Sequence, residues 1–490
     1  MQCGIPMVPS LHRMTAAWRR IARHSRIRGF FKLSDSSSTR ASSGTLRRQL
    51  FAQTWPMAIG VMSLLGFQLV DSAFVARLGT VPLAAQSFTF PITFLMIGVQ
   101  VGLGIAIAAL ISRALGAGEL ERARRLGSLV LFGGAVVIGF LAIALWIFHV
   151  PLFRQLGAQD DALELIGEYW PVQLLANWFA ALLYFGYTLF RAHNNTRLPG
   201  LLMVATSGLN LVFDPILIFG VGGWSGLGLP GAAWATTASF TIGLLLLGWR
   251  LAQRDWLSLA DLAGEMRRST GPFAVIAGPA MLSQLMPALS AMAATALIAS
   301  LGEQAVAAWG LASRLETVSL MLVLGLTMSL PPWLGHCYGA GNWPRIRALM
   351  SIAFQTVLVW QLILGTVMAL AAPWVADALS SDAGVRDGLT WLIRAMLPSY
   401  ALLGLCMLVV SASNALGWPL RAMMISFARL FVCYLPCIAL GVWLGEKMPY
   451  VGLGAALGNV LAGSMAWLVF RQSMRAMPEQ ARAHAAASSS

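Results

Sequence analysis

The chain has 490 residues, of which 58% are hydrophobic and only 11% are charged, and its formal net charge is +14. A soluble domain carries roughly a quarter charged residues, so this composition excludes an ordinary water-soluble protein. The positive charge does not indicate nucleic-acid binding, because the arginines are not gathered into a basic patch with interleaved aromatic residues. The composition therefore predicts an integral membrane protein with no nucleic-acid partner.

Apolar stretches of about twenty residues, enough to cross roughly 30 Å of hydrocarbon as a helix, recur along the whole chain. We predict an all-α integral membrane protein with twelve transmembrane helices joined by short gaps. The predicted spans are 51–77, 86–112, 127–150, 169–191, 199–220, 231–251, 272–300, 306–334, 350–373, 388–413, 422–444 and 450–472. Because the gaps between them are short, no soluble domain of useful size is expected.

Charge placement predicts the orientation, because Lys and Arg are retained on the cytoplasmic side of a membrane. One set of connecting segments is rich in arginine: 113, 122, 124, 125, 191, 197, 250, 254, 267, 268, 345, 347, 421, 471, 475 and 482. The other set carries only Arg77, Arg154, Arg386 and Lys447. This asymmetry predicts that both termini are cytoplasmic, in a multi-pass protein of the plasma membrane (the bacterial inner membrane).

The two ends of the chain differ from the rest in composition. Residues 1–48 are rich in Arg and Ser, with Asp35 as the only acid, and we expect a basic, disordered cytoplasmic tail. A targeting segment, or a true start at Met14 or later, remains an alternative interpretation. Residues 475–490 are likewise expected to form a disordered tail.

The chain contains an internal duplication. The segment "PMAIGVMSLLGFQLVDSAFVARLGTVPLAA" from Pro56 aligns without a gap with "PAMLSQLMPALSAMAATALIASLGEQAVAA" from Pro279, an offset of 223 residues (279 − 56). The same offset relates the Gly-Ala-Gly loops at 116 and 339. Six helices repeated in one orientation predict two lobes, 49–255 and 272–474, joined by a linker at 256–271 and related by a pseudo-twofold axis along the membrane normal. Transporters are built in this way.

The carboxylates are not duplicated. Asp71 falls opposite Ala294, and pairing Pro215 with Pro436 places Asp214 opposite Leu435. A charged carboxylate at the bilayer centre costs at least roughly 2.5–3.5 kcal/mol, so each of these side chains is expected to face protein or a water-filled cavity and to have a function.

Amide side chains accompany both carboxylates on the predicted helices. Asn210 and Asp214 are four residues apart and share one helical face, and Gln68 and Asp71 are three apart. We predict that these groups form a polar site in the first lobe that binds H⁺. Oxygen ligands also suit Na⁺, but we favour the proton because the second lobe has no acid that matches Asp71.

Several segments resemble the multidrug and toxic compound extrusion (MATE) transporters: "VDSAFVARLG", "GAGELERARR", "FRAHNNTRLP", "NLVFDP", "GLGLPGAAWATT" and "SRLE". The resemblance extends over nearly all of 45–475, and "NLVFDP" most resembles the bacterial DinF-like branch. It implies two six-helix lobes, antiport driven by a cation or proton, and export of organic, often cationic and amphipathic compounds. It also implies that Asp71, Asn210 and Asp214 are coupling residues and that Pro56 bends the first helix.

Further polar residues are candidates for a substrate or coupling network. Tyr187 stands where relatives in this branch often carry Asn, and Thr188 and Thr236 are weaker candidates. Glu316 and Arg314 are specific to the second lobe, and because they are two residues apart they do not face one another. Arg394 and Arg429 are possible partners of Glu316, for which a structural ion pair and a substrate or gating role are both open.

The sequence offers no catalytic or cofactor motif. A P-loop is missing, "GLGLPG" lacks a surrounding βαβ unit, and no His/Asp or Ser/His group converges. We therefore predict a monomeric secondary multidrug antiporter that is not an enzyme. It needs no cofactor or bound metal beyond the coupling H⁺ or Na⁺, and its partners are small organic substrates and membrane lipids. The alternative is a lipid-linked precursor flippase of the same superfamily.

Overall fold

The computed structural model describes residues 43–445 and 447–487, and within these ranges the chain forms helices and no strands. The predicted all-α class is therefore confirmed, whereas the predictions for residues 1–42 and 488–490 lie outside the described residues. Of the described residues, those up to Leu46 belong to one unit and those from Arg47 onward belong to a second. The arrangement below is that of the second unit.

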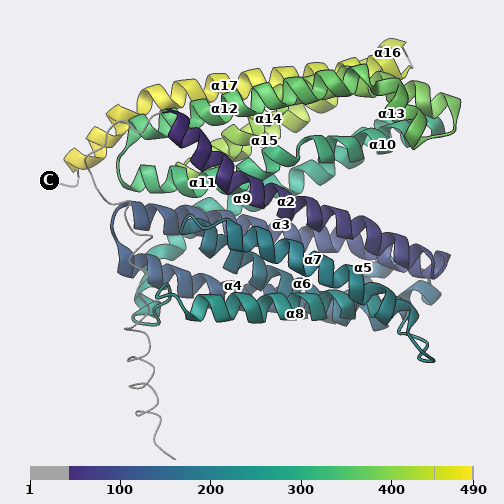
Figure 1. Cartoon of the computed structure of the whole chain (residues 1–490), viewed down its shortest axis with the longest axis horizontal. Helices are drawn as coiled ribbons and strands as arrows, with labels where there is room; N and C mark the ends of the chain where they lie inside the picture. The colour runs from purple at the N-terminus through teal and green to yellow at the C-terminus, as the bar shows by residue number, and fades with distance from the viewer. Residues whose placement is uncertain (1–42, 446, 488–490) are drawn as a thin grey trace, which may run out of the picture. The chain divides into compact units, whose positions relative to one another are not determined.

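The first lobe consists of six long helices and one short one. They are α2 (Ser43–Ala76), α3 (Thr80–Gly116), α4 (Leu120–Ile147), α5 (His149–Gln155), α6 (Asp160–Ala192), α7 (Arg197–Phe219) and α8 (Leu229–Ala252). All except the short α5 are apolar and long enough to cross a membrane. Helices α3 to α8 lie together on one side of the molecule (Figure 1).

The second lobe repeats this order. It consists of α9 (Leu262–Ala299), α10 (Glu303–Ser319), α11 (Met321–Gly339), α12 (Trp343–Leu370), α13 (Ala372–Leu379), α14 (Ala383–Ala415), α15 (Pro419–Phe427), the π-helix η1 (Ala428–Tyr434), α16 (Leu435–Gly445) and α17 (Met448–Ala487). Counting the bent pair α10–α11 as one span gives twelve spans among the described residues, as the sequence predicts.

The eighth span differs from the prediction of one helix over 306–334. It is broken at Leu320 into α10 and α11, which are bent by 44°. The buried Gln361 of α12 donates a hydrogen bond of 2.9 Å to the carbonyl oxygen of Ser319. A side chain inserted into the helical ladder in this way is a recognised cause of a kink.

Two helices extend beyond their predicted ends. Helix α9 begins at Leu262, inside the predicted linker, because the Asp261 side chain accepts a hydrogen bond from the Gly264 backbone nitrogen at 3.2 Å and caps the first turn. Helix α17 continues to Ala487, whereas a disordered tail is predicted from 475. Its last residues are rich in Ala, Arg, Glu and Gln, which are strong helix formers.

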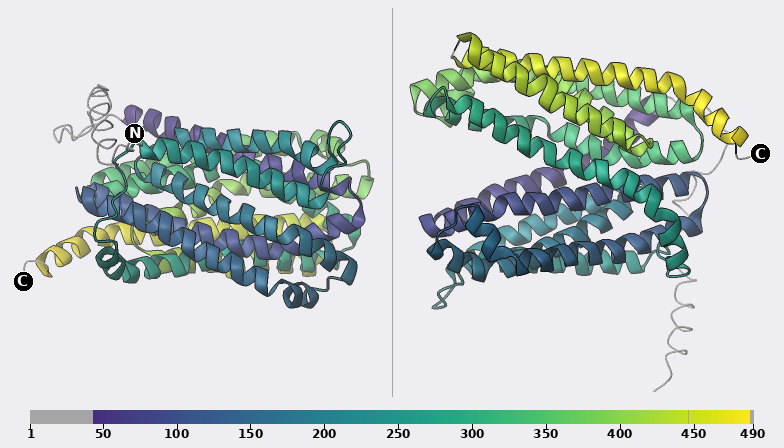
Figure 2. Two further views of the ribbon diagram at one scale, coloured as in Figure 1. Left: turned by 90° about the horizontal axis from the view of Figure 1, so that it is seen from below. Right: turned by 180° about the vertical axis from the view of Figure 1, so that it is seen from behind.

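The first helix of each lobe begins against the other lobe. In α2, Gln53 accepts a hydrogen bond of 2.5 Å from the Trp333 indole of α11. In α9, the buried Glu265 lies 3.3 Å from both Arg122 and Arg125 of α4. Figures 1 and 2 show α2 and α9 running between the two groups of helices.

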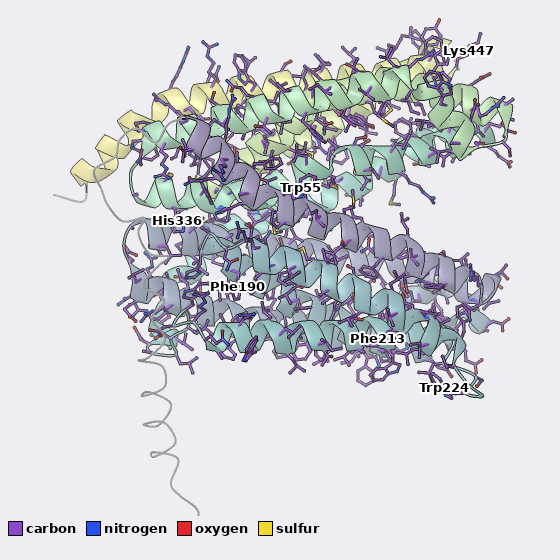
Figure 3. All side chains as sticks on the ribbon, viewed as in Figure 1. Trp55, Phe190, Phe213, Trp224, His336 and Lys447 are labelled. Carbon is purple, nitrogen blue, oxygen red and sulfur yellow. The ribbon has the colours of Figure 1, made fainter. Side chains whose placement is uncertain are left out.

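The bundle has two distinct ends. We call the end that contains the loops at 117–119, 193–196, 253–261 and 340–342 the arginine-rich end, and the end that contains the loops at 77–79, 220–228 and 300–302 the opposite end. His336 lies at the first, and Trp224 and Lys447 lie at the second (Figure 3). The predicted candidate residues lie between these ends.

Candidate functional site

The two carboxylates of the first lobe lie on α2 and α7, within electrostatic range of each other. Asp71 lies on α2 near its last turn, and Asp214 lies on α7, one residue before the internal Pro215. The two side chains are close enough to interact electrostatically. The residues that the sequence singles out on two separate helices therefore belong to one site.

The environment of Asp71 leaves one of its oxygens without a partner. Gln86 of α3 donates a hydrogen bond from Nε2 to Oδ2 of Asp71 at 3.1 Å. The other oxygen, Oδ1, is buried and has no hydrogen-bond partner, and the same is true of Oε1 of Gln86. A buried acceptor without a donor is costly, so this pair of oxygens is suited to receiving a proton or a small cation.

Asp214 is held by a short hydrogen-bonded chain. Asp214 and Asn210 are each only 1% exposed. With its amide nitrogen facing Asp214, Asn210 donates to Oδ2 of Asp214 at 2.8 Å and accepts from the backbone nitrogen of Thr236 at 3.1 Å and from its hydroxyl at 3.0 Å. The predicted residues Asn210, Asp214 and Thr236 are thus brought together by α7 and α8.

Other predicted residues lie elsewhere. Gln68 is exposed and makes no hydrogen bond among the described residues, and Thr188 donates to Tyr184 and accepts from Arg191 at 2.6 Å. Tyr187 is buried beside Thr206 of α7 and not against a carboxylate.

Pro56 lies inside α2, which continues through it as one helix. A Cβ at Gly200 of α7 would overlap its carbonyl oxygen. The predicted bend at Pro56 stays a prediction.

Three residues of the site were missed by the sequence reasoning. Gln86, Thr89 and Tyr169 are 2–4% exposed and lie around Asp71. Thr89 donates to the carbonyl oxygen of Gln86 at 2.6 Å, and Tyr169 donates to Gln173 at 2.8 Å. A polar residue inside an apolar span, such as Gln86 in "LAAQSFTF", is the signal that could have found them.

The second lobe contains a separate polar cluster. The hydroxyl of the fully buried Tyr400 donates to Oε2 of Glu316 at 3.1 Å, and Arg429 of η1 lies within electrostatic range of this carboxylate. The described residues form no ion pair with Glu316 within 4 Å, and Arg314 is exposed two residues away. The structure therefore does not join Glu316 and Arg314 to the site of Asp71.

The chemistry available at the first-lobe site follows from its donor set. Carboxylate, amide and hydroxyl oxygens converge there from α2, α3, α7 and α8. No group of three or more His, Cys, Asp or Glu side chains that could hold a metal ion occurs in the described part of the chain. The oxygens can accept a proton or coordinate a hard monovalent cation.

Comparisons with known proteins agree with this architecture. The MatE family model matches residues 56–216 and 279–440, once in each lobe. The chain is 33% identical over 428 residues to a FAD transporter of Shewanella oneidensis, covering 86% of this chain and 93% of the relative. It is 23% identical over 364 residues to the multidrug export protein MepA of Staphylococcus aureus, covering 74% and 79%.

Two solved transporter structures are similar in fold to this chain. The MATE transporter VcmN of Vibrio cholerae in its bent form is 45% identical and superposes with a TM-score of 0.85, covering 89% of this chain and 98% of that one. A MOP superfamily transporter from Pyrococcus furiosus is 24% identical with a TM-score of 0.81, covering 88% of this chain and 97% of that one, which indicates a shared fold.

Proposed function

Because the chain belongs to the MATE family of multi-pass membrane transporters, we propose that it is a secondary antiporter that exports organic compounds in exchange for protons. Members of this family are transporters and not enzymes. The substrates we propose are cationic amphipathic compounds. The arginine-rich end is assigned to the cytoplasm of a bacterial cell, together with both termini, by the bias of Arg between the two sets of connecting segments.

The observation that carries this proposal is the buried, unpartnered Oδ1 of Asp71, whose other oxygen accepts from Gln86, a residue with an unpartnered oxygen of its own. Protonation of Asp71 would turn a buried acceptor that has no donor into a donor, and so would remove the cost of leaving it unpaired. Asp214 lies within electrostatic range, so a proton on either carboxyl also relieves the repulsion between them. The site therefore supports the role of a proton-coupling centre.

The proposed cycle links this centre to the movement of α2. Asp71 on α2 and Asp214 on α7 repel each other when both are charged. Proton entry from outside removes this repulsion, allows α2 to close on the first-lobe site, and expels the bound compound. Release of the proton to the cytoplasm resets the site. One proton moving down 100 mV supplies roughly 2.3 kcal/mol, enough to drive export without a nucleotide.

The test is transport of ethidium in liposomes that contain the purified full chain, with an imposed pH gradient or an imposed Na⁺ gradient. We expect transport in wild type with the pH gradient alone. Asp71→Asn and Asp214→Asn should abolish gradient-driven transport. The matched control is Asp160→Asn, because Asp160 is a 92% exposed carboxylate at the opposite end and its loss should leave transport unchanged.

Each outcome separates one part of the proposal. Transport that requires the Na⁺ gradient would replace the proton by Na⁺ at the same site. Gradient-driven transport that persists in both Asp variants would overturn the assignment of the site. A folded wild type that moves no ethidium under either gradient would favour a different substrate class, including the lipid-linked precursors moved by flippases of the same superfamily.

A second candidate substrate is a flavin dinucleotide. The relative named as a FAD transporter is more similar (33% identity) than the multidrug export protein (23%). In addition, Arg314, Arg394 and Arg429 lie within helices of the second lobe, and the first two are exposed. Arginines are well suited to binding a pyrophosphate. FAD loaded into the same liposomes tests this candidate, and FAD transport without ethidium transport would establish it in place of the cationic compounds.

A further inference from the structure

The two lobes meet closely where α3 and α11 end at the arginine-rich end. A Cβ at Gly116 would overlap the carbonyl oxygen of His336, and a Cβ at Gly339 would overlap the carbonyl oxygen of Arg113. Both residues therefore have to be glycine for the two backbones to approach so closely. The contact is reciprocal, because each helix places its final glycine on the backbone of the other.

Cross-lobe hydrogen bonds surround this contact. Arg113 of α3 donates from Nε and Nη2 to the carbonyl oxygen of Ala415 at 3.0 and 2.8 Å, and from Nη2 to that of Asn414 at 3.1 Å. His336 of α11 donates from Nε2 to the carbonyl oxygen of Ala192 at 2.9 Å. Ala415 and Ala192 are the last residues of α14 and α6, whose terminal carbonyls lack helical partners.

These bonds are related by the internal duplication. The 223-residue offset that relates Gly116 to Gly339 also relates Arg113 to His336, and Ala192 to Ala415. The first lobe therefore bonds the second through Arg113, and the second lobe bonds the first through His336, at equivalent positions. The two sides of this contact differ in strength. The charged guanidinium of Arg113 makes three charge-assisted hydrogen bonds to the negative end of α14, whereas the imidazole of His336 makes one hydrogen bond to the end of α6.

We propose that Arg113 and His336 are the two halves of a latch that holds the arginine-rich end closed, and that both must release before this end can open. The guanidinium of Arg113 also lies 5.1 Å from the centre of the Tyr338 ring on α11, which adds a cation–π contact between the lobes. Arg113, the stronger half, sets how stable the closed state is, and His336, the weaker half, sets how readily the closed state opens. This inference rests on the alternating access in the proposed function and does not depend on the identity of the substrate.

The test measures conformation directly, so that it stays informative if the proposed substrate or ion is wrong. Spin labels are placed on Leu120→Cys and Pro344→Cys, which lie at the arginine-rich ends of the two lobes and are both exposed, in a background without the five native cysteines. Double electron–electron resonance then gives the proportions of short (closed) and long (open) distances in nanodiscs.

We expect Arg113→Gln to raise the open-to-closed ratio about ten- to a hundredfold and His336→Gln about two- to tenfold, because charged hydrogen bonds are stronger than neutral ones. His336→Arg should lower the ratio. The swap Arg113→His with His336→Arg should remain closed, because the equivalent carbonyls accept either side chain. This swap also keeps the proposal testable if a single variant folds poorly.

The matched control is Arg347→Gln. Arg347 also donates to a helix carbonyl, that of Met474 at 3.1 Å, but α12 and α17 belong to the same lobe. Its loss should leave the distances unchanged. The proposal is overturned if Arg113→Gln and His336→Gln do not lengthen the distances, or if Arg347→Gln lengthens them equally.

Discussion

The two lobes share one helix order, but they use their interiors differently. The first lobe brings two carboxylates together from α2 and α7, and it keeps α3 as one unbroken helix. The second lobe has Glu316 bonded to Tyr400, a broken α10–α11 pair and a π-helix. The duplication thus conserves the scaffold, while the polar chemistry differs between the two copies.

One pair of equivalent residues differs at the position of the break. Gln361 of α12 and Ile138 of α4 are related by the 223-residue offset, and each is 1% exposed. Gln361 donates to Ser319 where α10 ends, whereas Ile138 has no polar atom to offer α3. A single buried amide therefore accompanies a broken helix in one lobe and an apolar side chain accompanies a straight helix in the other.

The packing also corrects one sequence alignment. A Cβ at Gly231 would overlap the carbonyl oxygen of Leu217, and a Cβ at Gly454 would overlap that of Cys437. Leu217 and Cys437 are therefore equivalent, which places Asp214 opposite Tyr434. Pairing Pro215 with Pro436 wrongly places it opposite Leu435. The position that carries the carboxylate of Asp214 in one lobe carries the phenol of Tyr434 in the other.

The largest expected effect separates the two polar sites. Asp71→Asn should reduce gradient-driven transport at least about a hundredfold, whereas Glu316→Gln should retain more than half of it. The reason is that the unpartnered oxygens lie at Asp71, while Glu316 is bonded to Tyr400. Transport rates in liposomes decide this, and an equal loss in both variants would show that the second lobe also couples ion movement.

The next effect tests the symmetry of the contact between α3 and α11. Gly116→Ala and Gly339→Ala should each shift the spin-label distances toward the open state about tenfold or more, because backbone atoms cannot move aside for a methyl group. The two shifts should be similar in size. Gly118→Ala is a useful contrast, since a Cβ there meets no atom within 4 Å, although its positive φ adds local strain.

A smaller effect concerns His193, whose equivalent in the second lobe is Leu416. Burial lowers the pKa of His193 from 6.5 to about 4, and its ring stacks on Trp256 at 3.9 Å. Above pH 6.5 the imidazole of His193 is neutral in both the folded and the unfolded state. Between pH 6.5 and 4 only the unfolded state gains a proton, so the free energy of unfolding should fall by about 2–3 kcal/mol.

His193→Leu, which installs the residue of the second lobe, should remove this part of the pH dependence. The measurement is the difference between wild type and variant in unfolding free energy in detergent at pH 7.5 and pH 4.5. A difference that does not change with pH would contradict the assignment to His193.

The smallest effect concerns the broken helix. Gln361→Ile should lower the free energy of unfolding by about 1–2 kcal/mol if the Ser319 carbonyl is left without its donor. If the variant instead straightens α10–α11, a structure of the variant would show an angle well below 44°. Unchanged stability together with an unchanged angle would show that Gln361 follows the break and does not stabilise it.

The sequence was sufficient for the twelve spans and the duplication, because both depend on hydropathy and on constant spacing. It also singled out Asp71, Asn210 and Asp214, since a carboxylate in an apolar span is conspicuous, and their coupling role stays a prediction. Membership of the MATE family likewise agrees with the resemblance of the quoted motifs.

The remaining features depend on contacts between distant segments, which spacing does not reveal. Gln86 and Tyr169 lie beside Asp71 only because α3 and α6 pack against α2, and the break at Leu320 depends on a side chain from another helix. His336 likewise bonds Ala192 across the lobes, a contact that joins residues 144 positions apart. Gln68 is exposed, which helical spacing alone does not reveal, and its place in the site stays a prediction.

The reciprocal glycine contact at the ends of α3 and α11 has a consequence for the symmetry of the two lobes. A contact in which each partner uses the same residues is isologous, as in a twofold homodimer. A dimer of identical six-helix subunits would contain one such hydrogen bond twice. Here the two equivalent donors are Arg113 and His336, and the acceptors are Ala415 and Ala192. In a single chain the two equivalent positions need not carry the same residue, and here they carry an arginine and a histidine.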